Sequence, residues 1–92
     1  MEYQVDFALG KHIIVEPVDE SGILRAEEAA SIFKVVSFGI DCLNCSELKS
    51  GILINKGDFI IVAQNSVEHA MMGGKKVYFV VESDVIAKVK NV

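Results

Sequence analysis

Hydrophobic residues in this chain occur in short runs that are separated by turn-forming residues. The strongest run is Phe59-Ile60-Ile61-Val62, which directly follows the turn sequence Asn55-Lys56-Gly57-Asp58. A run this short, rich in β-branched and aromatic residues, is typical of a strand with both faces buried rather than of a helix. The pattern therefore predicts that residues 57–62 form the central strand of a small all-β domain.

Similar runs predict further strands on both sides of this one. At the N-terminus, Tyr3, Val5, Phe7 and Leu9 alternate with mostly polar residues, which predicts a half-buried strand at a sheet edge or against another subunit. The other predicted strands are residues 12–16, 32–38, 67–72, 77–81 and 85–89, and residues 52–54 lead into the central strand. Short, closely spaced strands without a long helix favour a small β-barrel.

Two segments interrupt this pattern. Residues 18–31 are mostly small or charged and carry an isolated apolar pair, Ile23 and Leu24, so a long loop is predicted there. The pair can be a loop anchor pinned to the core or an exposed binding element, and one turn of helix over residues 26–30 is a further alternative for this segment. Residues 40–51 contain two cysteines among polar residues and are predicted to be a turn or an excursion between strands.

Composition narrows the class of protein. The 92 residues suffice for one domain, 51% of them are hydrophobic, and the net charge is −4. Nucleic-acid binding is not expected, because only Lys75 and Lys76 are adjacent basic residues. No apolar run reaches the roughly 18 residues of a membrane span, and Glu2 and Asp6 stand where a signal peptide would be basic. A cytoplasmic protein without a membrane partner is expected.

The candidate chemistry centres on Cys42 and Cys45. Their C-x-x-C spacing lets two thiolates reach one Zn²⁺, but a closed site needs four ligands, which His12 and His69 could complete only if the fold brought them near. Free thiols are the favoured interpretation, and metal binding and redox chemistry stay as alternatives. No nucleophile, phosphate-binding or dinucleotide motif is present, so neither an enzyme nor a cofactor is predicted.

Three stretches resemble a known family: His12-Ile13-Ile14-Val15-Glu16-Pro17, the central run from Gly57 to Val62, and residues 78–87 with sequence YFVVESDVIA. Together with the apolar run that ends at Gly39, they are similar to GroES-type co-chaperonins, the ten-kilodalton chaperonin family, with a divergent or phage-encoded member the best match. The resemblance covers nearly the whole chain and implies a GroES-like β-barrel. It implies a non-enzymatic lid that caps a GroEL-type chaperonin ring, encloses a non-native client protein and assists ATP-dependent folding.

The resemblance also implies roles for particular residues. Residues 18–31 correspond to the family's mobile loop, in which Gly22, Ile23 and Leu24 would dock on the chaperonin, with Arg25 at the third apolar position. Residues 40–51 would fall at the roof of a seven-membered ring, in the cytoplasm of a bacterium or of a phage-infected host. The first strand of one subunit would meet the last strand of its neighbour, which implies the interface residues Val5, Phe7, Leu9, Val85, Ile86 and Val89.

Two other classes remain as alternatives. One is a small metal-binding or redox protein that uses Cys42 and Cys45. The other is the GroES-like barrel of zinc alcohol dehydrogenases, which is disfavoured because the chain has neither a nucleotide-binding domain nor the catalytic-zinc ligand pattern.

Overall fold

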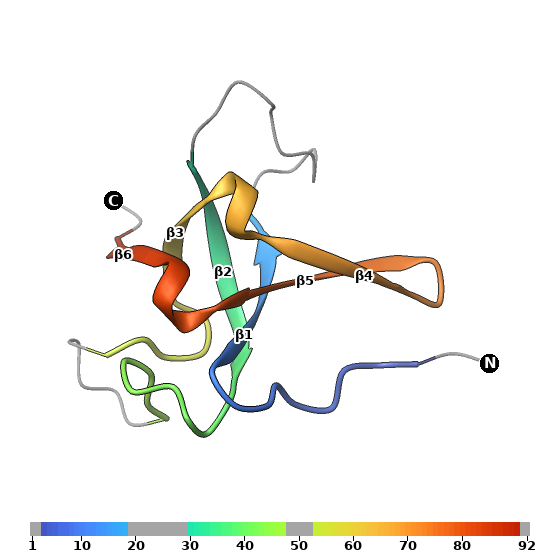
Figure 1. Cartoon of the computed structure of the whole chain (residues 1–92), viewed down its shortest axis with the longest axis horizontal. Helices are drawn as coiled ribbons and strands as arrows, with labels where there is room; N and C mark the ends of the chain where they lie inside the picture. The colour runs from blue at the N-terminus through green and yellow to red at the C-terminus, as the bar shows by residue number, and fades with distance from the viewer. Residues whose placement is uncertain (1–2, 19–29, 48–52, 91–92) are drawn as a thin grey trace.

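The computed structural model describes residues 3–18, 30–47 and 53–90 and contains no α-helix in these ranges (Figure 1). Six antiparallel strands form one sheet in the order β4-β5-β1-β2-β3-β6, which confirms the all-β prediction. The strands are β1 His12–Pro17, β2 Ala30–Phe38, β3 Phe59–Ala63, β4 Glu68–Met72, β5 Lys75–Val81 and β6 Val85–Val89, and the 3-10 helices are η1 Gln64–Ser66 and η2 Glu82–Asp84.

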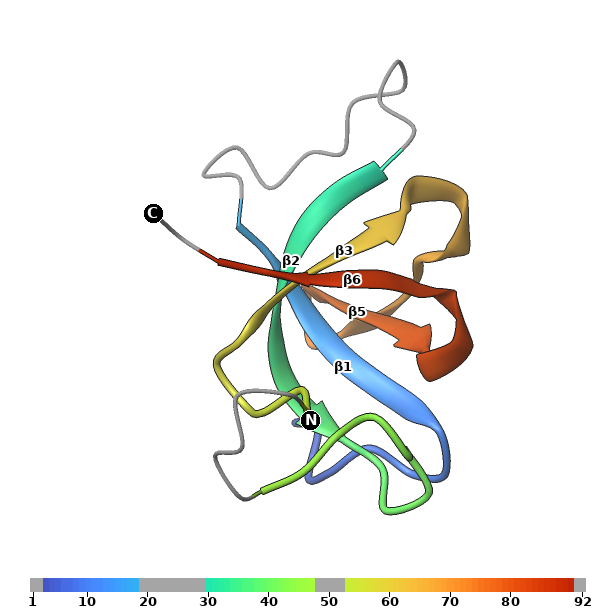
Figure 2. The same cartoon turned by 90° about the vertical axis from the view of Figure 1, so that its left-hand side faces the viewer.

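The sheet is strongly curled, as its connections require. η2 alone links β5 to β6, although β1, β2 and β3 lie between these strands in the sheet. In a flat sheet the two strands would be about 19 Å apart, at about 4.8 Å per strand. The chain from Val81 to Val85 reaches at most about 14 Å. The sheet must therefore bend back on itself, and Figure 2 shows β3, β5 and β6 running across the direction of β1 and β2.

The core lies inside this curl. Alternate residues of β1, β2 and β3 point inward, as their pleat requires. The fully buried side chains are Ile13, Val15, Phe33, Val35, Ile60, Val62 and Val80, and Cys42, Cys45 and Ile54 extend the same cluster. The curled sheet is thus filled by aliphatic and aromatic side chains in the way that a small barrel is. Closure into a barrel is not seen among the described strands, where β4 and β6 pair with different neighbours.

The prediction for the central strand needs a correction. Within β3, Ile60 and Val62 are fully buried, but Phe59 and Ile61 are only half-buried. β3 lies next to the edge strand β6, and the middle of the sheet is formed by β1 and β2. The long apolar run reflects packing against β6 and nearby side chains rather than a central position, because periodicity records burial and not strand order.

The predicted first strand is not formed in the single chain. Residues 3–9 have no strand structure, and the apolar side chains of Val5, Phe7 and Leu9 are exposed while Ala8 is buried. The backbone N–H of Ala8 donates to Ser37 Oγ at 3.2 Å instead of to a neighbouring strand. The expected inward face of this segment therefore points to solvent, because no strand ladder in the described part of the chain includes residues 3–9.

The remaining boundaries follow the predictions closely. The strand predicted at 12–16 extends to Pro17, that at 32–38 begins at Ala30, and that at 77–81 begins at Lys75. β4 and β5 form a hairpin that projects from the body of the molecule (Figure 1), with its turn at Gly73 and Gly74, which both have positive φ. Most of the predicted loop at 18–31 connects β1 to β2 and lies outside the described residues.

Candidate functional site

The cysteine segment is held against the start of β1 by close backbone packing. The N–H of Gly39 donates to the carbonyl of His12 at 2.9 Å, and the N–H of Asp41 donates to the carbonyl of Gly10 at 3.0 Å. A Cβ at Gly39 would collide with the Gly10 carbonyl, so only glycine fits there. Gly10 in turn has a φ of 62°, a left-handed conformation that favours glycine. These two glycines place the turn that carries Cys42.

Cys42, Cys45 and Glu82 form one compact group. One potential ligand atom from each, two Sγ atoms and one carboxylate oxygen, lie within 4.8 Å of one another. Both thiols are free and buried, and the group is the candidate metal-ligand set in the described part of the chain. The pair that sequence analysis treated as half of a metal site therefore has a third partner.

Glu82 reaches the cysteines because β5 ends beside the start of β1. The N–H of Glu82 donates to the carbonyl of Lys11 at 2.9 Å, which fixes the first residue of η2. Its carboxylate Oε2 accepts a hydrogen bond of 2.9 Å from the backbone N–H of Asn44, between the two cysteines. This contact spans 38 positions in the sequence, so no local spacing signal could have found it.

The electrostatics of the group favour protonated thiols in the metal-free protein. Burial is the largest cause that raises the pKa of Cys45, to about 12, with further contributions from Cys42 and from the negative charge of Glu82. The pKa of Cys42 is raised as well, by burial first and by Glu82 second. Redox-active cysteines instead have lowered pKa values in electropositive surroundings. The arrangement is therefore poorly suited to thiol redox chemistry at neutral pH.

The cysteines line an open groove of about 580 Å³ on the surface. Its other walls include Phe7 and Leu9 from the N-terminal segment and Ile40. Solvent and small ions in this groove can reach the thiol side of the group. A metal ion would thus have a path of entry, which a site inside a closed core would lack.

The two histidines do not join this group. Nδ1 of His12 lies 3.2 Å from the carbonyl oxygen of Leu9, and the imidazole ring packs edge-on to Phe79. The backbone carbonyl of His12, rather than its ring, lies 3.7 Å from Cys42 Sγ. His69 is on β4, where its ring packs against Tyr78. Both histidines pack against aromatic rings, so the histidine completion considered from the sequence is not seen.

The residues assigned to a subunit interface lie on two separate exposed surfaces. Phe7 and Leu9 are 63% and 69% exposed in the N-terminal segment, and Ile86 is 61% exposed on β6. Val85 and Val89 are half-buried. β6 pairs with β3 on one side, and its other side has no strand partner among the described residues. Large apolar side chains beside an open strand edge are typical of a surface that another chain covers.

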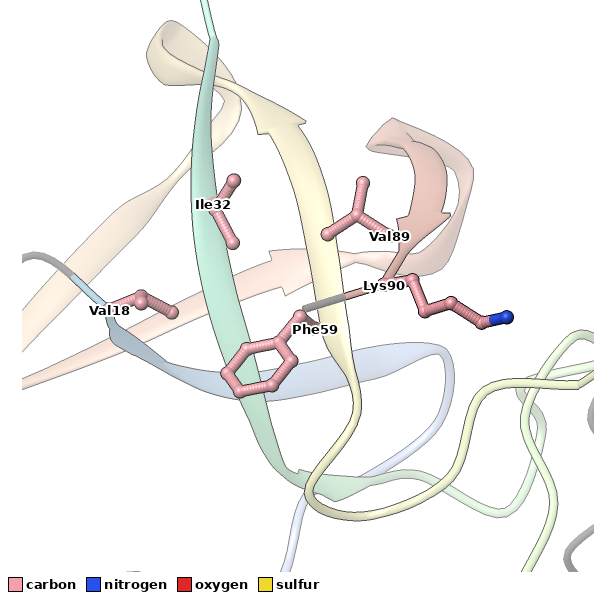
Figure 3. Close-up of a pocket in the computed structure, with 5 residues that line it drawn as sticks. All are labelled: Val18, Ile32, Phe59, Val89 and Lys90. Atoms are coloured by element: carbon pink, nitrogen blue, oxygen red, sulfur yellow. The ribbon is translucent and has the colours of Figure 1, made fainter. Parts of the chain in front are cut away.

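An apolar hollow adjoins this edge. It has a volume of about 150 Å³ and is lined by Val18, Ile32, Phe59, Val89 and Lys90. Figure 3 shows that these side chains come from β2, β3 and β6 and from the residues that follow β1 and β6, with the Lys90 amine directed away. A cavity of about this size holds a benzene-sized group. The hollow therefore has room for one apolar side chain from a second chain.

Gly22, Ile23 and Leu24, the predicted chaperonin contacts, lie outside the described residues. Of the predicted roof segment, residues 40–47 are described, and they contain the two cysteines. No helix in the described part of the chain has the length and apolar character that crossing a membrane requires.

No protein-family model matches the chain, and a search of curated proteins finds no similar sequence. The resemblance to co-chaperonins therefore stays a prediction from the residues themselves.

Proposed function

We propose that this chain is one subunit of a GroES-type co-chaperonin, a homo-oligomeric lid that caps a GroEL-type chaperonin ring and owns no enzymatic activity. The observation that carries the proposal is the position of its two exposed apolar surfaces. In Figure 1 the N-terminal segment starts at the right and runs back beneath the sheet to β1, whereas β6 lies at the left. The two surfaces differ from each other, so one can meet the other on a neighbouring chain.

This arrangement supports a ring. A contact between two different surfaces of the same chain is heterologous, and repeated heterologous contacts close into rings when the rotation allows. Residues 3–9 of one subunit would pair along β6 of the next and bury Val5, Phe7 and Leu9 against Val85, Ile86 and Val89. One apolar side chain of the segment would enter the hollow beside Val89. The family resemblance sets the expected number of subunits at seven.

The same pairing completes a GroES-like barrel. A curled sheet with an open edge invites uncontrolled association, and covering that edge with a defined strand removes the hazard. The neighbour's segment would supply this cover. The strand that the N-terminal alternation predicts would then form in the oligomer, where its partner exists.

The lid would bind the chaperonin through residues 18–31. One loop that buries Ile23 and Leu24 gains only a few kcal/mol, at about 1.5–3 kcal/mol for each side chain. Several loops on one ring bind with a high effective concentration once the first has docked, so the ring supplies avidity while single contacts stay weak enough for release. The client is a non-native protein enclosed beneath the lid, in the cytoplasm of a bacterium or a phage-infected host.

Native mass and chaperonin binding together test the proposal. Purified chain should have seven times the subunit mass by light scattering, and it should co-elute with a GroEL-type double ring only when nucleotide is added. A stable monomer at micromolar concentration that fails to bind the chaperonin would contradict the lid. A heptamer that lowers the ATPase rate of the chaperonin and raises the yield of a refolding client would support it.

A further inference from the structure

We propose that Cys42, Cys45 and Glu82 form a zinc site that ties the cysteine segment to the connection between β5 and β6. The site is independent of the lid function. It rests on three side chains of suitable chemistry that two distant parts of the chain bring together in one buried group.

The geometry suits a tetrahedral ion. Zn²⁺ binds thiolates at about 2.3 Å and carboxylate oxygens at about 2.0–2.2 Å, so tetrahedral ligand atoms are about 3.5–3.8 Å apart. In this structure the two Sγ atoms and the carboxylate oxygen all lie within 4.8 Å of one another. Binding therefore requires the three ligand atoms to approach one another by about 1 Å or less from this upper limit.

The donor set selects the kind of ion. Two thiolates favour a soft or borderline ion, whereas Mg²⁺ and Ca²⁺ prefer oxygen ligands alone. Zn²⁺ accepts two sulfurs and a carboxylate oxygen and keeps a fourth position for water. The carbonyls of Gly10 and His12 lie 3.9 and 3.7 Å from Cys42 Sγ and accept its hydrogen bond in the metal-free protein.

The binding step balances in charge and protons. The Cys42 and Cys45 S–H bonds break, two Zn–S bonds and one Zn–O bond form, and two protons pass to the buffer. The ion then carries two thiolates and the Glu82 carboxylate, with a total charge of −1. No oxidant or reductant takes part.

The carboxylate is already oriented for this role. Its Oε2 accepts the Asn44 N–H at 2.9 Å, and hydrogen bonds of this type to a ligating carboxylate set its direction. Because Asn44 lies between the cysteines, the ion and the hydrogen bond would hold the same two segments together. The open groove beside the cysteines supplies the entry path.

Metal titration of the reduced, metal-free protein tests the site. We expect one Zn²⁺ per subunit by elemental analysis. We also expect that Co²⁺, used as a spectroscopic probe, gives a thiolate-to-metal charge-transfer band and the visible spectrum of a tetrahedral ion. A Co²⁺ spectrum without thiolate character, or no bound metal, would overturn the proposal. So would a Cys42–Cys45 disulfide that forms readily in a mild glutathione buffer in the presence of Zn²⁺.

Matched variants assign the ligands. Glu82→Gln keeps an acceptor for the Asn44 N–H and should weaken Zn²⁺ binding at least about tenfold, and Cys42→Ser with Cys45→Ser should abolish it. Glu47→Gln is the control, because Glu47 lines the same groove without belonging to the group. If Glu82→Gln and the unchanged protein bind Zn²⁺ with equal affinity, the Glu82 carboxylate is not a ligand.

The comparison of Glu82→Gln with Glu47→Gln and the unchanged protein does not depend on whether the double cysteine variant folds. Far-UV circular dichroism checks that these three proteins are folded. Chaperonin binding is measured separately. A chain that binds zinc but no chaperonin supports this site alone, and one that binds chaperonin but no zinc supports the lid alone.

Discussion

The backbone N–H of Asn44 donates a hydrogen bond of 2.9 Å to the carboxylate of Glu82, 38 positions further along the chain. This contact joins the cysteine segment to η2, which itself joins β5 to β6. The contact therefore connects the predicted roof segment, which carries the two cysteines, to β6, the strand expected at the subunit interface.

The raised pKa of Cys45 predicts how the stability of the metal-free protein changes in alkali. The folded thiol keeps its proton up to about pH 12, whereas the unfolded thiol releases it near its ordinary pKa of 9.0. Between these values the unfolded state binds fewer protons, so the free energy of unfolding falls as pH rises. Urea denaturation under reducing conditions at about pH 8 and about pH 10 should show this fall.

Cys45→Ser is the control for this measurement, because it removes this thiol and leaves the rest of the chain unchanged. Its free energy of unfolding should fall less between the two pH values. An identical fall in both proteins would show that Cys45 is not the group responsible.

Gly39→Ala should destabilise the fold by about 3 kcal/mol, because the added methyl group meets backbone atoms of Leu9 and Gly10 that cannot move aside cheaply. Gly74→Ala is the comparison. Gly74 has a φ of 83° but open space around its Cβ position, so only backbone strain of about 1 kcal/mol is expected. Chemical denaturation measures both, and equal losses would contradict the close packing at Gly39.

Ile86→Asp should dissociate the oligomer while the subunit stays folded. Ile86 is 61% exposed in the single chain, so a charge costs little there. In the proposed ring the neighbouring subunit covers this position. The variant therefore loses about 1.5–3 kcal/mol of apolar burial at each interface. The aspartate carboxylate must also be desolvated there. Sedimentation at micromolar concentration distinguishes ring from monomer.

Met71→Asp is the matched control for Ile86→Asp. Met71 is 60% exposed on β4, the opposite edge of the sheet. It should leave the oligomer intact. If both variants dissociate the ring or neither does, the contact does not run along β6.

Ile23→Asp should leave the oligomer intact and weaken chaperonin binding at least about 100-fold, because every loop of the ring loses the same apolar contact and avidity multiplies the loss. Ala29→Asp adds the same charge to the same segment outside the Gly-Ile-Leu sequence, and it should bind nearly normally. Co-sedimentation with the chaperonin in the presence of nucleotide measures both variants. Loss of the ring itself in Ile23→Asp would show that Ile23 is a structural residue.

Much of the fold could be predicted from the sequence, because strand formation depends on local features. The alternation and apolar runs located β1, β2, β3, β5 and β6, and Gly73-Gly74 located the β4–β5 turn. Burial of Ile13, Val15, Ile60 and Val62 follows from the same runs. These positions are determined by side-chain hydrophobicity with period two, which is present in the chain before any contact forms.

The order of the strands and the membership of the site were decided only by the tertiary structure. Periodicity could not show that β3 lies beside the edge strand, because a strand next to an edge can be as well covered as a central one. It also could not show that residues 3–9 form no strand in the described structure of the single chain. The approach of Glu82 to Cys42 and Cys45 depends on the antiparallel pairing of β5 with β1, which sets Val81 opposite His12. A contact across that sequence distance leaves no spacing pattern, so the sequence could name His12 and His69 only as ligands that depended on the fold. The structure places the carboxylate of Glu82 beside the thiols instead.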